Sequence, residues 1–374
     1  MVIPQRSALD SGFCRTWVAV LLGLLLSSFD LKAGEPTSFR FCANSPEQDI
    51  QKALDALDGG GEVVLGAGTY AIRQPIILQH DYEVLRGAGP NTILRLEDNA
   101  NCPVVILGAP TLRRSVGHLR LADLLIDGNR AHQRVEFWRT AADGSEINNN
   151  GVEVEGATDA IIERVVCCRC RSGGLVTSAG TRRLTVRDFA AYDNQFDGLA
   201  CYLTEDSHFS DLFIHDNLAA GISLDLAFNR NVIDKAVLSG NDLGIFMRDA
   251  RDNVFSGLTI CQCRHHGVFM AQAAAPTKNG WQLCPGTECT GNRFGALQIA
   301  DCSGKPFLVN DASCTNNLFS LSALPVSETT ATAPKLLDVR AFAIASSEHQ
   351  PAGEDIGQRS SHSKTQLAGL SSSK

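Results

Sequence analysis

Hydrophobic positions between Gly151 and Met270 recur in short alternating runs, and each run is led by a glycine. These glycines are Gly151, Gly174, Gly198, Gly221, Gly244 and Gly267. Their nearly constant spacing is a repeat of about 23 residues, which is the sequence sign of a solenoid, in which each repeat forms one coil and stacks on the next. The glycine period therefore predicts the architecture of this part of the chain.

Most residues one and three places after each glycine are apolar, which predicts that these positions face inward. The pairs are Val152 and Val154, Leu175 and Thr177, Leu199 and Cys201, Ile222 and Leu224, Ile245 and Met247, and Val268 and Met270. Alternation with a period of two is typical of β-strands, whose intervening residues face the other side. A second β-rich run, such as residues 209–214, leaves no room for a helix in the repeat. We therefore predict an all-β chain that forms a single parallel β-helix of about 23 residues per coil.

A polar column accompanies the glycine period. Cys170, Asn194, Asn217, Asn241 and Cys263 stand three or four residues before the next glycine, where each coil has to turn. Asparagine favours turns, and stacked asparagine side chains can bond to one another and to the turn backbone. Three asparagines in register favour a ladder over a simple turn preference.

The region before the regular repeats predicts a capping helix and less regular first coils. Ser45, Pro46 and Glu47 precede Ile50, Leu54 and Leu57 at helical spacing, and residues 59–61 are glycines that end the helix. A helix laid across the first coil would protect the open end of a solenoid. Strand patterns follow at residues 62–65, 75–78, 92–96, 104–107 and 119–126.

The two ends of the chain differ in composition from the repeats. Residues 1–33 resemble a signal peptide, because Arg6 and Arg15 precede an apolar run and Leu31-Lys-Ala33 resembles a cleavage site. The apolar run is too short to span a membrane comfortably. We therefore expect a secreted or periplasmic protein, with a β-helix domain at residues 34–325 and a low-complexity, disordered tail at 326–374.

The charge and the cysteines narrow the function further. Loss of the signal peptide would remove three cations and two anions, so the net charge would move from -8 to -9, which excludes typical nucleic-acid binding. Cys14 would also leave, and the twelve remaining cysteines permit disulfides of undetermined connectivity. The cluster of Cys167, Cys168, Cys170, Cys261 and Cys263 matches no zinc spacing, so we expect disulfides or core packing there. We take a monomer as the default oligomeric state.

Two insertions interrupt the period, and insertions on a solenoid often form its binding face. Residues 130–150 contain Trp138, a candidate substrate-binding residue, and a polar run of asparagines. Residues 271–290 contain Trp281 with Cys284 and Cys289, and we expect these two cysteines to close the second insertion.

Several motifs resemble the pectate-lyase-like right-handed β-helix superfamily. They are Gly61-Glu-Val-Val-Leu65, Leu85-Arg-Gly-Ala-Gly89 and Ile126-Asp-Gly-Asn129, followed by the glycine-led coils, and the likeness covers residues 45–324. Within it, Asn194-Gln-Phe-Asp-Gly-Leu199 and Arg264-His-His-Gly-Val268 resemble coils of mannuronan C5-epimerases and related alginate-active proteins. The resemblance implies a right-handed coil and an extracytoplasmic, frequently acidic, polysaccharide bound along a parallel sheet. The epimerase motif Asp-Pro-His-Asp/Glu and the motif set of the polygalacturonases are both missing from the sequence.

The outward positions supply the candidate chemistry. The fourth residue after each glycine is Glu155, Ser178, Tyr202, Asp225, Arg248 and Ala271. Coils lie about 4.8 Å apart, so Tyr202, Asp225 and Arg248 would form an exposed row of about 10 Å, the size of one or two sugar units. Removal of the proton beside a uronic-acid carboxyl group needs a cation, a base and an acid. We predict Arg248 as the cation and Tyr202, Asp225 or His266 in the acid and base roles; the alternative is an exposed Asp225–Arg248 pair without chemistry.

Further residues near this row are candidates for substrate binding. They are Glu155, Asp197, Asp249, His265 and Trp138, with His265 and His266 directed to opposite sides of their strand. We assign no cofactor and no metal site; Asp249 and Asp252 are candidate Ca²⁺ ligands, although such sites take six to eight oxygens.

These observations lead to one functional hypothesis and two alternatives. We expect an exported protein that acts on a uronic-acid polysaccharide as a lyase or C5-epimerase, with Arg248, Asp225, Tyr202 and His266 as its catalytic residues. A glycoside hydrolase is the second hypothesis, and it would need two carboxylates about 5 to 10 Å apart, such as Asp225 and Asp249. A carbohydrate-binding or surface protein without turnover is the third.

Overall fold

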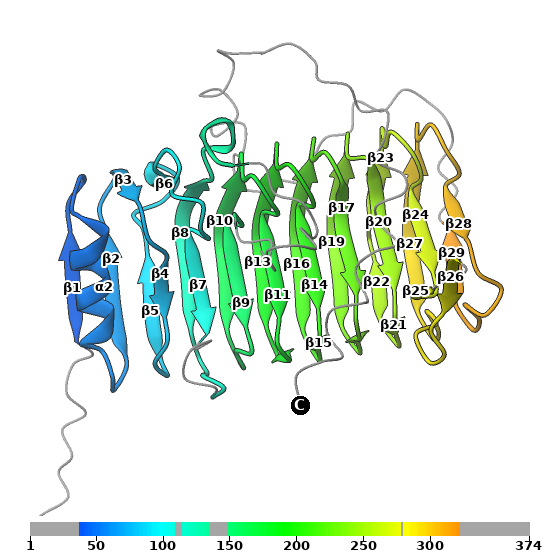
Figure 1. Cartoon of the computed structure of the whole chain (residues 1–374), viewed down its shortest axis with the longest axis horizontal. Helices are drawn as coiled ribbons and strands as arrows, with labels where there is room; N and C mark the ends of the chain where they lie inside the picture. The colour runs from blue at the N-terminus through cyan, green and yellow to red at the C-terminus, as the bar shows by residue number, and fades with distance from the viewer. Residues whose placement is uncertain (1–36, 109–113, 135–148, 278–279, 322–374) are drawn as a thin grey trace, which may run out of the picture. The chain divides into compact units, whose positions relative to one another are not determined.

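A computed structural model describes residues 37–108, 114–134, 149–277 and 280–321. The predicted signal peptide and low-complexity tail lie outside the described residues, as does most of the first insertion. Within the described ranges, most strands belong to parallel sheets, and the coils that they form follow one another in chain order (Figure 1). None of the helices in these ranges has the length and apolar character needed to cross a membrane.

Sheet A is the largest of the parallel sheets and carries the longest strands. Its strand order is β1-β2-β5-β8-β10-β13-β16-β19-β22-β27-β23, with β3, β6 and β29 attached beside this path. The strands are β1 (Ser38–Phe41), β2 (Gly61–Leu65), β3 (Gly68–Ile72), β5 (Glu83–Arg86), β6 (Thr92–Leu96), β8 (Arg120–Asp127), β10 (Ile161–Cys168), β13 (Thr185–Tyr192), β16 (His208–His215), β19 (Val232–Ser239), β22 (Val254–Ser256), β23 (Thr259–Cys261), β27 (Arg293–Ala300) and β29 (Leu318–Leu321).

Sheet B contains the strands that follow the periodic glycines. Its members are β4 (Ile76–Leu78), β7 (Val105–Gly108), β9 (Val152–Glu155), β11 (Leu175–Ser178), β14 (Leu199–Tyr202), β17 (Ala220–Asp225), β20 (Leu243–Arg248), β24 (Val268–Ala271) and β28 (Phe307–Val309). The residue after each glycine pairs with its equivalent one coil later, as Leu199 does with Ile222 and Ile222 with Ile245. The predicted stacking of glycine-led coils is therefore confirmed.

A short third sheet and a hairpin complete the described strands. Sheet C joins β12 (Thr181–Arg182), β15 (Thr204–Glu205), β18 (Phe228–Asn229) and β21 (Ala250–Arg251). The second insertion forms an antiparallel hairpin of β25 (Ala274–Thr277) and β26 (Gly280–Leu283). Each regular coil thus contributes one strand to each of the three parallel sheets.

The periodic glycines exist because neighbouring coils come too close for a side chain. A Cβ atom on Gly174 would lie 2.6 Å from the carbonyl oxygen of Gly198, and one on Gly244 would lie 2.4 Å from that of Gly267. Real Cβ atoms essentially never show such distances to backbone. Steric crowding between coils, rather than a special backbone angle, therefore imposes glycine at this position.

The core and the corner ladder agree with the sequence pattern. The inward positions of sheet B, such as Val152, Ile222 and Met247, are fully buried. Asn194 donates from Nδ2 to Oδ1 of Asn217, which in turn donates to Oδ1 of Asn241, both at 2.9 Å. The predicted asparagine ladder is confirmed.

A second ladder at another corner was not predicted. Asn231, Asn253 and Asn292 each donate from Nδ2 to the Oδ1 atom of the next member, and Asn317 ends the series. Each of these side-chain oxygens also accepts the backbone N–H of the preceding member. Asparagine ladders therefore stabilise two different corners of the coil.

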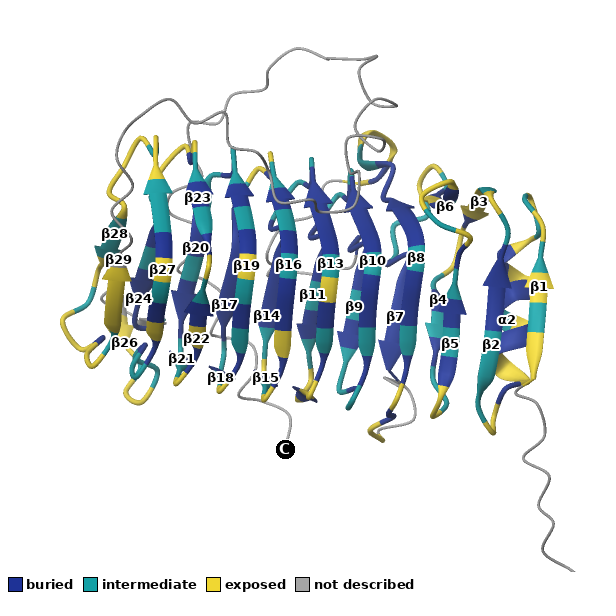
Figure 2. Cartoon of the chain, turned by 180° about the vertical axis from the view of Figure 1, so that it is seen from behind, coloured by how far each residue is buried: buried dark blue, intermediate teal, exposed yellow. Residues whose placement is uncertain are grey.

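The N-terminal helix is present, but a strand precedes it. Helix α2 (Glu47–Asp55) buries Ile50, Ala53 and Leu54 and packs against β2, β3 and β4. Strand β1, which the sequence analysis did not predict, pairs with β2 and forms the end of sheet A. Figure 2 shows exposed residues on β1 and at the opposite end around β29, whereas the central strands are mostly buried. A 3-10 turn, η1 (Arg130–His132), follows β8.

Candidate functional site

The candidate site lies on the outward face of sheet B, at the ends of β14, β17 and β20. Tyr202 pairs with Asp225 across neighbouring strands, and Nε of Arg248 donates to Oδ2 of Asp225 at 2.9 Å. The three side chains therefore occupy one column on the same side of the coils. The predicted grouping of these residues is confirmed.

The prediction that this row is exposed was wrong for two of its members. Asp225 is 0% and Arg248 4% exposed, whereas Tyr202 is half-buried. The two opposite charges stand on adjacent strands and neutralise each other, which makes burial of both tolerable. Every residue of β17 is buried, including those on its outward face. Asp225 also accepts the backbone N–H of Leu226 at 2.8 Å.

The acidic residues of this region respond to burial and to one another. Burial raises the pKa of Asp225 against the lowering effect of Arg248. Burial also raises the pKa of Asp249, and the charge of Asp225 adds to this effect while Arg251 opposes it. Asp249 accepts a hydrogen bond from Nη2 of Arg251 at 3.1 Å. Each carboxylate thus has its own arginine partner.

The residues present do not fit a calcium ion. Asp249, one of the two candidate ligands, is engaged by Arg251. In the described ranges no three acidic, histidine or cysteine side chains gather into a group that could hold a metal.

The two histidines lie away from the Asp225–Arg248 pair. His266 precedes its glycine and Arg248 follows its own by four residues, which separates them by about 16 Å along the strand direction. Nδ1 of His266 accepts the backbone N–H of Lys305 at 2.9 Å, and its ring stacks near Phe269 at 6.3 Å. His266 therefore lies beside Phe269 rather than beside the Asp225–Arg248 pair, and its catalytic role stays a prediction. Burial, with the nearby charges of His265 and Lys305, lowers the pKa of His266.

The remaining candidates for substrate binding are scattered. His265 is exposed and pairs with Asp242 at 2.9 Å. Asp197 is only 5% exposed and accepts the backbone N–H of Ala220 at 2.8 Å, and burial raises its pKa to about 7. Asp197 is thus a buried turn residue and not an outward contact. Glu155 is half-buried at the end of β9, and Trp138 lies outside the described residues.

Two aromatic residues on the same face were missed by the sequence analysis. Phe246 and Phe269 face outward two places after their glycines, and their rings stack with centroids 5.5 Å apart and planes 5° from parallel. The guanidinium carbon of Arg248 lies 5.1 Å from the centroid of Phe246. Extending the column analysis to the second residue after each glycine would have found this pair. We call Tyr202, Asp225, Phe246, Arg248 and Phe269 the sheet B face.

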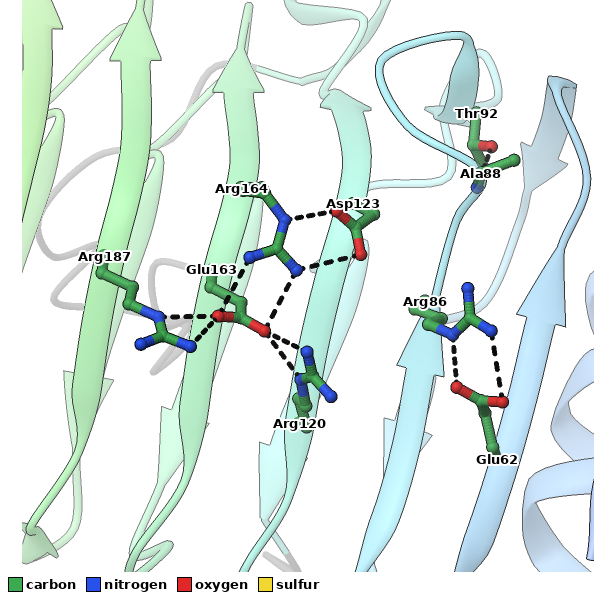
Figure 3. A network of polar contacts seen from close by, with 9 residues as sticks. All are labelled: Glu62, Arg86, Ala88, Thr92, Arg120, Asp123, Glu163, Arg164 and Arg187. Atoms are coloured by element: carbon green, nitrogen blue, oxygen red, sulfur yellow. Dashed lines mark hydrogen bonds and ion pairs between the residues drawn. The ribbon is translucent and has the colours of Figure 1, made fainter. Parts of the chain in front are cut away.

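A second charged cluster lies on sheet A, and its partners are all within the protein. Glu163 is fully buried and accepts hydrogen bonds from Arg120, Arg164 and Arg187, while Arg164 also binds Asp123 (Figure 3). Burial would raise the pKa of Glu163, but hydrogen bonds from the three arginines lower it to about 2. The cluster ties neighbouring coils together, and the low pKa of Glu163 keeps this carboxylate ionised at neutral pH.

Comparison with known proteins gives one family model and several relatives. The model of the right handed beta helix region matches residues 150–281. Mannuronan C5-epimerase AlgE4 of Azotobacter vinelandii is 28% identical over 186 residues, which are 47% of this chain and 32% of that protein. Mannuronan C5-epimerase AlgE5 of the same organism is also 28% identical, over 51% of this chain and 20% of that protein. The chain therefore spans a third or less of these relatives.

Solved structures share the architecture over a longer range. The A-module of mannuronan C-5 epimerase AlgE6 from Azotobacter vinelandii matches with a TM-score of 0.51 and 18% identity, covering 76% of this chain and 97% of the module. An alginate lyase from Paenibacillus sp. matches with a TM-score of 0.50 and 12% identity, covering 76% of this chain and 99% of the lyase. Together with the stacked parallel coils, these matches show that the chain has the right-handed parallel β-helix fold.

Proposed function

We propose that the chain acts on a uronic-acid polysaccharide bound along the sheet B face, by β-elimination or C5 epimerisation. The observation that carries this proposal is the Asp225–Arg248 ion pair, which lies between half-buried Tyr202 and the stacked rings of Phe246 and Phe269. The names of the relatives, mannuronan epimerases and an alginate lyase, support an acidic polysaccharide as the substrate class.

The proposed chemistry assigns one role to each part of the face. The guanidinium of Arg248 stabilises the charge that develops on the sugar carboxyl group when the neighbouring proton leaves. Asp225 is a positioning residue, because its carboxylate is buried and holds Arg248 in place. Phe246 and Phe269 offer flat apolar surfaces for the faces of sugar rings.

Proton transfer falls to Tyr202 in this proposal. Asp225 is buried against Arg248, and Nδ1 of His266 is occupied by the backbone N–H of Lys305 at 2.9 Å. A single residue can take the proton and return it to the leaving oxygen in β-elimination. Epimerisation needs a second donor on the opposite face of the ring, so the geometry favours the lyase.

The test measures products on alginate, pectate and neutral glycans. A lyase gives an unsaturated product that absorbs in the near ultraviolet, an epimerase changes the sugar composition by NMR, and a hydrolase gives only new reducing ends. Replacement of Tyr202 by Phe should lower kcat at least about 100-fold, because general acid–base catalysis contributes that much. Tyr82→Phe is the matched control, since Tyr82 is 59% exposed near the N-terminal end. Unchanged turnover in folded Tyr202→Phe would refute the assignment.

A second candidate function is polysaccharide binding without turnover. It is favoured by the mutual satisfaction of Asp225 and Arg248 and by the missing Asp-Pro-His motif. Saturable binding to an acidic polysaccharide without any product would establish it. A hydrolase is less well supported, because Asp225 and Asp249 each pair with an arginine.

Export belongs to the same proposal. The signal-like residues 1–33 and an extracytoplasmic substrate class both call for a secreted or periplasmic protein. Cell fractionation of the full chain tests this, and retention of an uncleaved chain in the cytoplasm would contradict it.

A further inference from the structure

Cysteines from neighbouring coils lie side by side at a corner near the C-terminal end of the described solenoid. Cys261 of β23 pairs with Ala300 of β27, so Cys263 and Cys302, two residues later on each coil, are neighbours. The N–H of Ser303 donates to the carbonyl oxygen of Cys263 at 3.0 Å, which continues this register through the corner. Both thiols are directed in the same way, each toward the carbonyl oxygen two residues before it.

A second pair occupies a different corner of the same coils. Asn292 donates to Oδ1 of Asn317 at 2.9 Å, which fixes the register of the last two coils there. Cys289 and Cys314 stand three residues before these asparagines and are 0% and 8% exposed. The Cys289 thiol donates to the carbonyl oxygen of Ala271 at 3.5 Å, and its interaction with the Cys314 sulfur lowers the pKa of Cys314. This contact favours the thiolate form that attacks disulfides.

We propose that Cys263 with Cys302, and Cys289 with Cys314, form disulfides that join the last coil to the preceding ones. Aligned positions on neighbouring coils are about 4.8 Å apart. This spacing falls within the Cα separation of about 4.4–6.8 Å that a disulfide spans. All four cysteines are thiols in the structure.

The chemistry is a thiol–disulfide exchange with a low-molecular-weight disulfide. One thiolate attacks oxidised glutathione and releases one reduced glutathione, which leaves a mixed disulfide on the protein. The neighbouring thiol then displaces the second glutathione, so each pair loses two electrons and two protons. An oxidising extracytoplasmic compartment would supply such an oxidant, and this is the only part of the inference that rests on the proposed export.

Within the described ranges, the buried cysteines Cys170 and Cys201 have no cysteine at the aligned position of the next coil. Cys170 is followed in its column by Asn194, and Cys201 lies between Thr177 and Leu224. The structure places Cys289 beside Cys314, so we propose Cys314 as its partner in place of the predicted Cys284. The two pairs of aligned cysteines thus lie near the C-terminal end of the described coils.

Cross-links would stabilise the last described coil, which is the one with an exposed outer strand. Leu318 and Phe319 of β29 are 62% and 40% exposed, so this end of sheet A is poorly covered among the described residues. One cross-link would close the loop from Cys263 to Cys302, which includes the hairpin of β25 and β26, and the other would close the loop from Cys289 to Cys314. Closing loops longer than a single coil restricts the unfolded chain and stabilises the folded one.

The test oxidises the purified full chain with oxidised glutathione, both after folding and during refolding, and maps the cross-links by mass spectrometry. Digestion with trypsin and Asp-N should give residues 252–264 linked to 301–310, and residues 279–293 linked to 311–335. Reduction should lower the unfolding midpoint by about 5 °C or more. Because the oxidant is added, the outcome does not depend on export or on polysaccharide activity.

Matched variants assign each cross-link to one cysteine. Cys263→Ser and Cys289→Ser should each abolish one linked peptide, whereas Cys261→Ser and Cys284→Ser should leave both in place. The inference is overturned if the four thiols still react with an alkylating agent after oxidation. It is also overturned if Cys261 or Cys284 provides the cross-link instead.

Discussion

Replacing Gly244 with alanine tests whether the glycine period exists because neighbouring coils leave no room for a side chain. The added Cβ would lie 2.4 Å from the carbonyl oxygen of Gly267 and 2.4 Å from Cγ2 of Ile260. An ordinary contact needs at least about 3.4 Å, so the coils would have to separate by about 1 Å at this point. The carbonyl group belongs to the backbone of the next coil and cannot rotate away.

The expected cost follows from two contributions. Overpacking of a tightly packed site costs about 1–3 kcal/mol. Separation of the coils also weakens the hydrogen bonds from Gly244 N–H to His266 O and from Ile245 N–H to Gly267 O, now at 3.1 and 2.8 Å, each worth about 1 kcal/mol. We therefore expect the free energy of unfolding to fall by about 3 kcal/mol.

Urea unfolding followed by circular dichroism measures this difference, with Gly295→Ala as the matched control. A Cβ on Gly295 would meet no heavy atom within 4 Å, and neither glycine has a left-handed backbone. The control should therefore stay within about 0.5 kcal/mol of the natural chain. Equal midpoints for the two alanine variants would refute the steric explanation of the period.

Three further predictions concern the ladder, the pH dependence and the aromatic pair. Asn217→Ala removes both hydrogen bonds that Asn217 accepts from Asn194 and leaves buried groups unpaired, so unfolding measurements should show a loss of about 3 kcal/mol. The pKa of Asp197 is about 7 in the folded protein against an ordinary 3.8, so the folded state holds the proton more tightly. Stability should therefore fall as pH rises from about 4 to 7, and Asp197→Asn should reduce this slope in denaturation measured across that range. Phe246→Ala should weaken polysaccharide binding in calorimetry about tenfold if its ring supports a sugar.

The sequence pattern was sufficient to predict the coils because their geometry repeats at a fixed chain length. The glycine period gives the register of sheet B, and alternation with a period of two gives its inward face. The asparagines of the first ladder have the same spacing as the periodic glycines, so the same analysis predicted them. Each of these features depends only on spacing, which is visible in a single sequence.

The second ladder was missed because an insertion breaks its spacing. Its members, Asn231, Asn253, Asn292 and Asn317, follow one another at unequal steps, since the hairpin of β25 and β26 lies between the second and the third. Strand β1 was missed for a related reason, because Ser38–Phe41 is short and stands outside the repeats. Residues on neighbouring coils keep their contacts when a hairpin is inserted between them, although the insertion changes the number of residues that separate them in the sequence.

The environment of the outward columns was the least predictable feature. Alternation tells which side of a strand a residue faces, but it does not tell whether that side is buried. One signal was available: Asp225 and Arg248 are opposite charges separated by one repeat of the glycine period, which places them on adjacent coils. Opposite charges at that spacing are expected to pair with each other before they meet a substrate.

Burial of the Asp225–Arg248 pair changes the proposed mechanism without removing the cation from it. A guanidinium held by a buried carboxylate and packed on Phe246 cannot reorient freely, and fixed charges stabilise a developing negative charge better than mobile ones. The same burial prevents Asp225 from exchanging a proton with a bound sugar, because breaking its pair would leave Arg248 uncompensated. Proton transfer on this face therefore depends on Tyr202, which makes the hydroxyl group of that residue the point where an enzyme and a binding protein with this fold would differ.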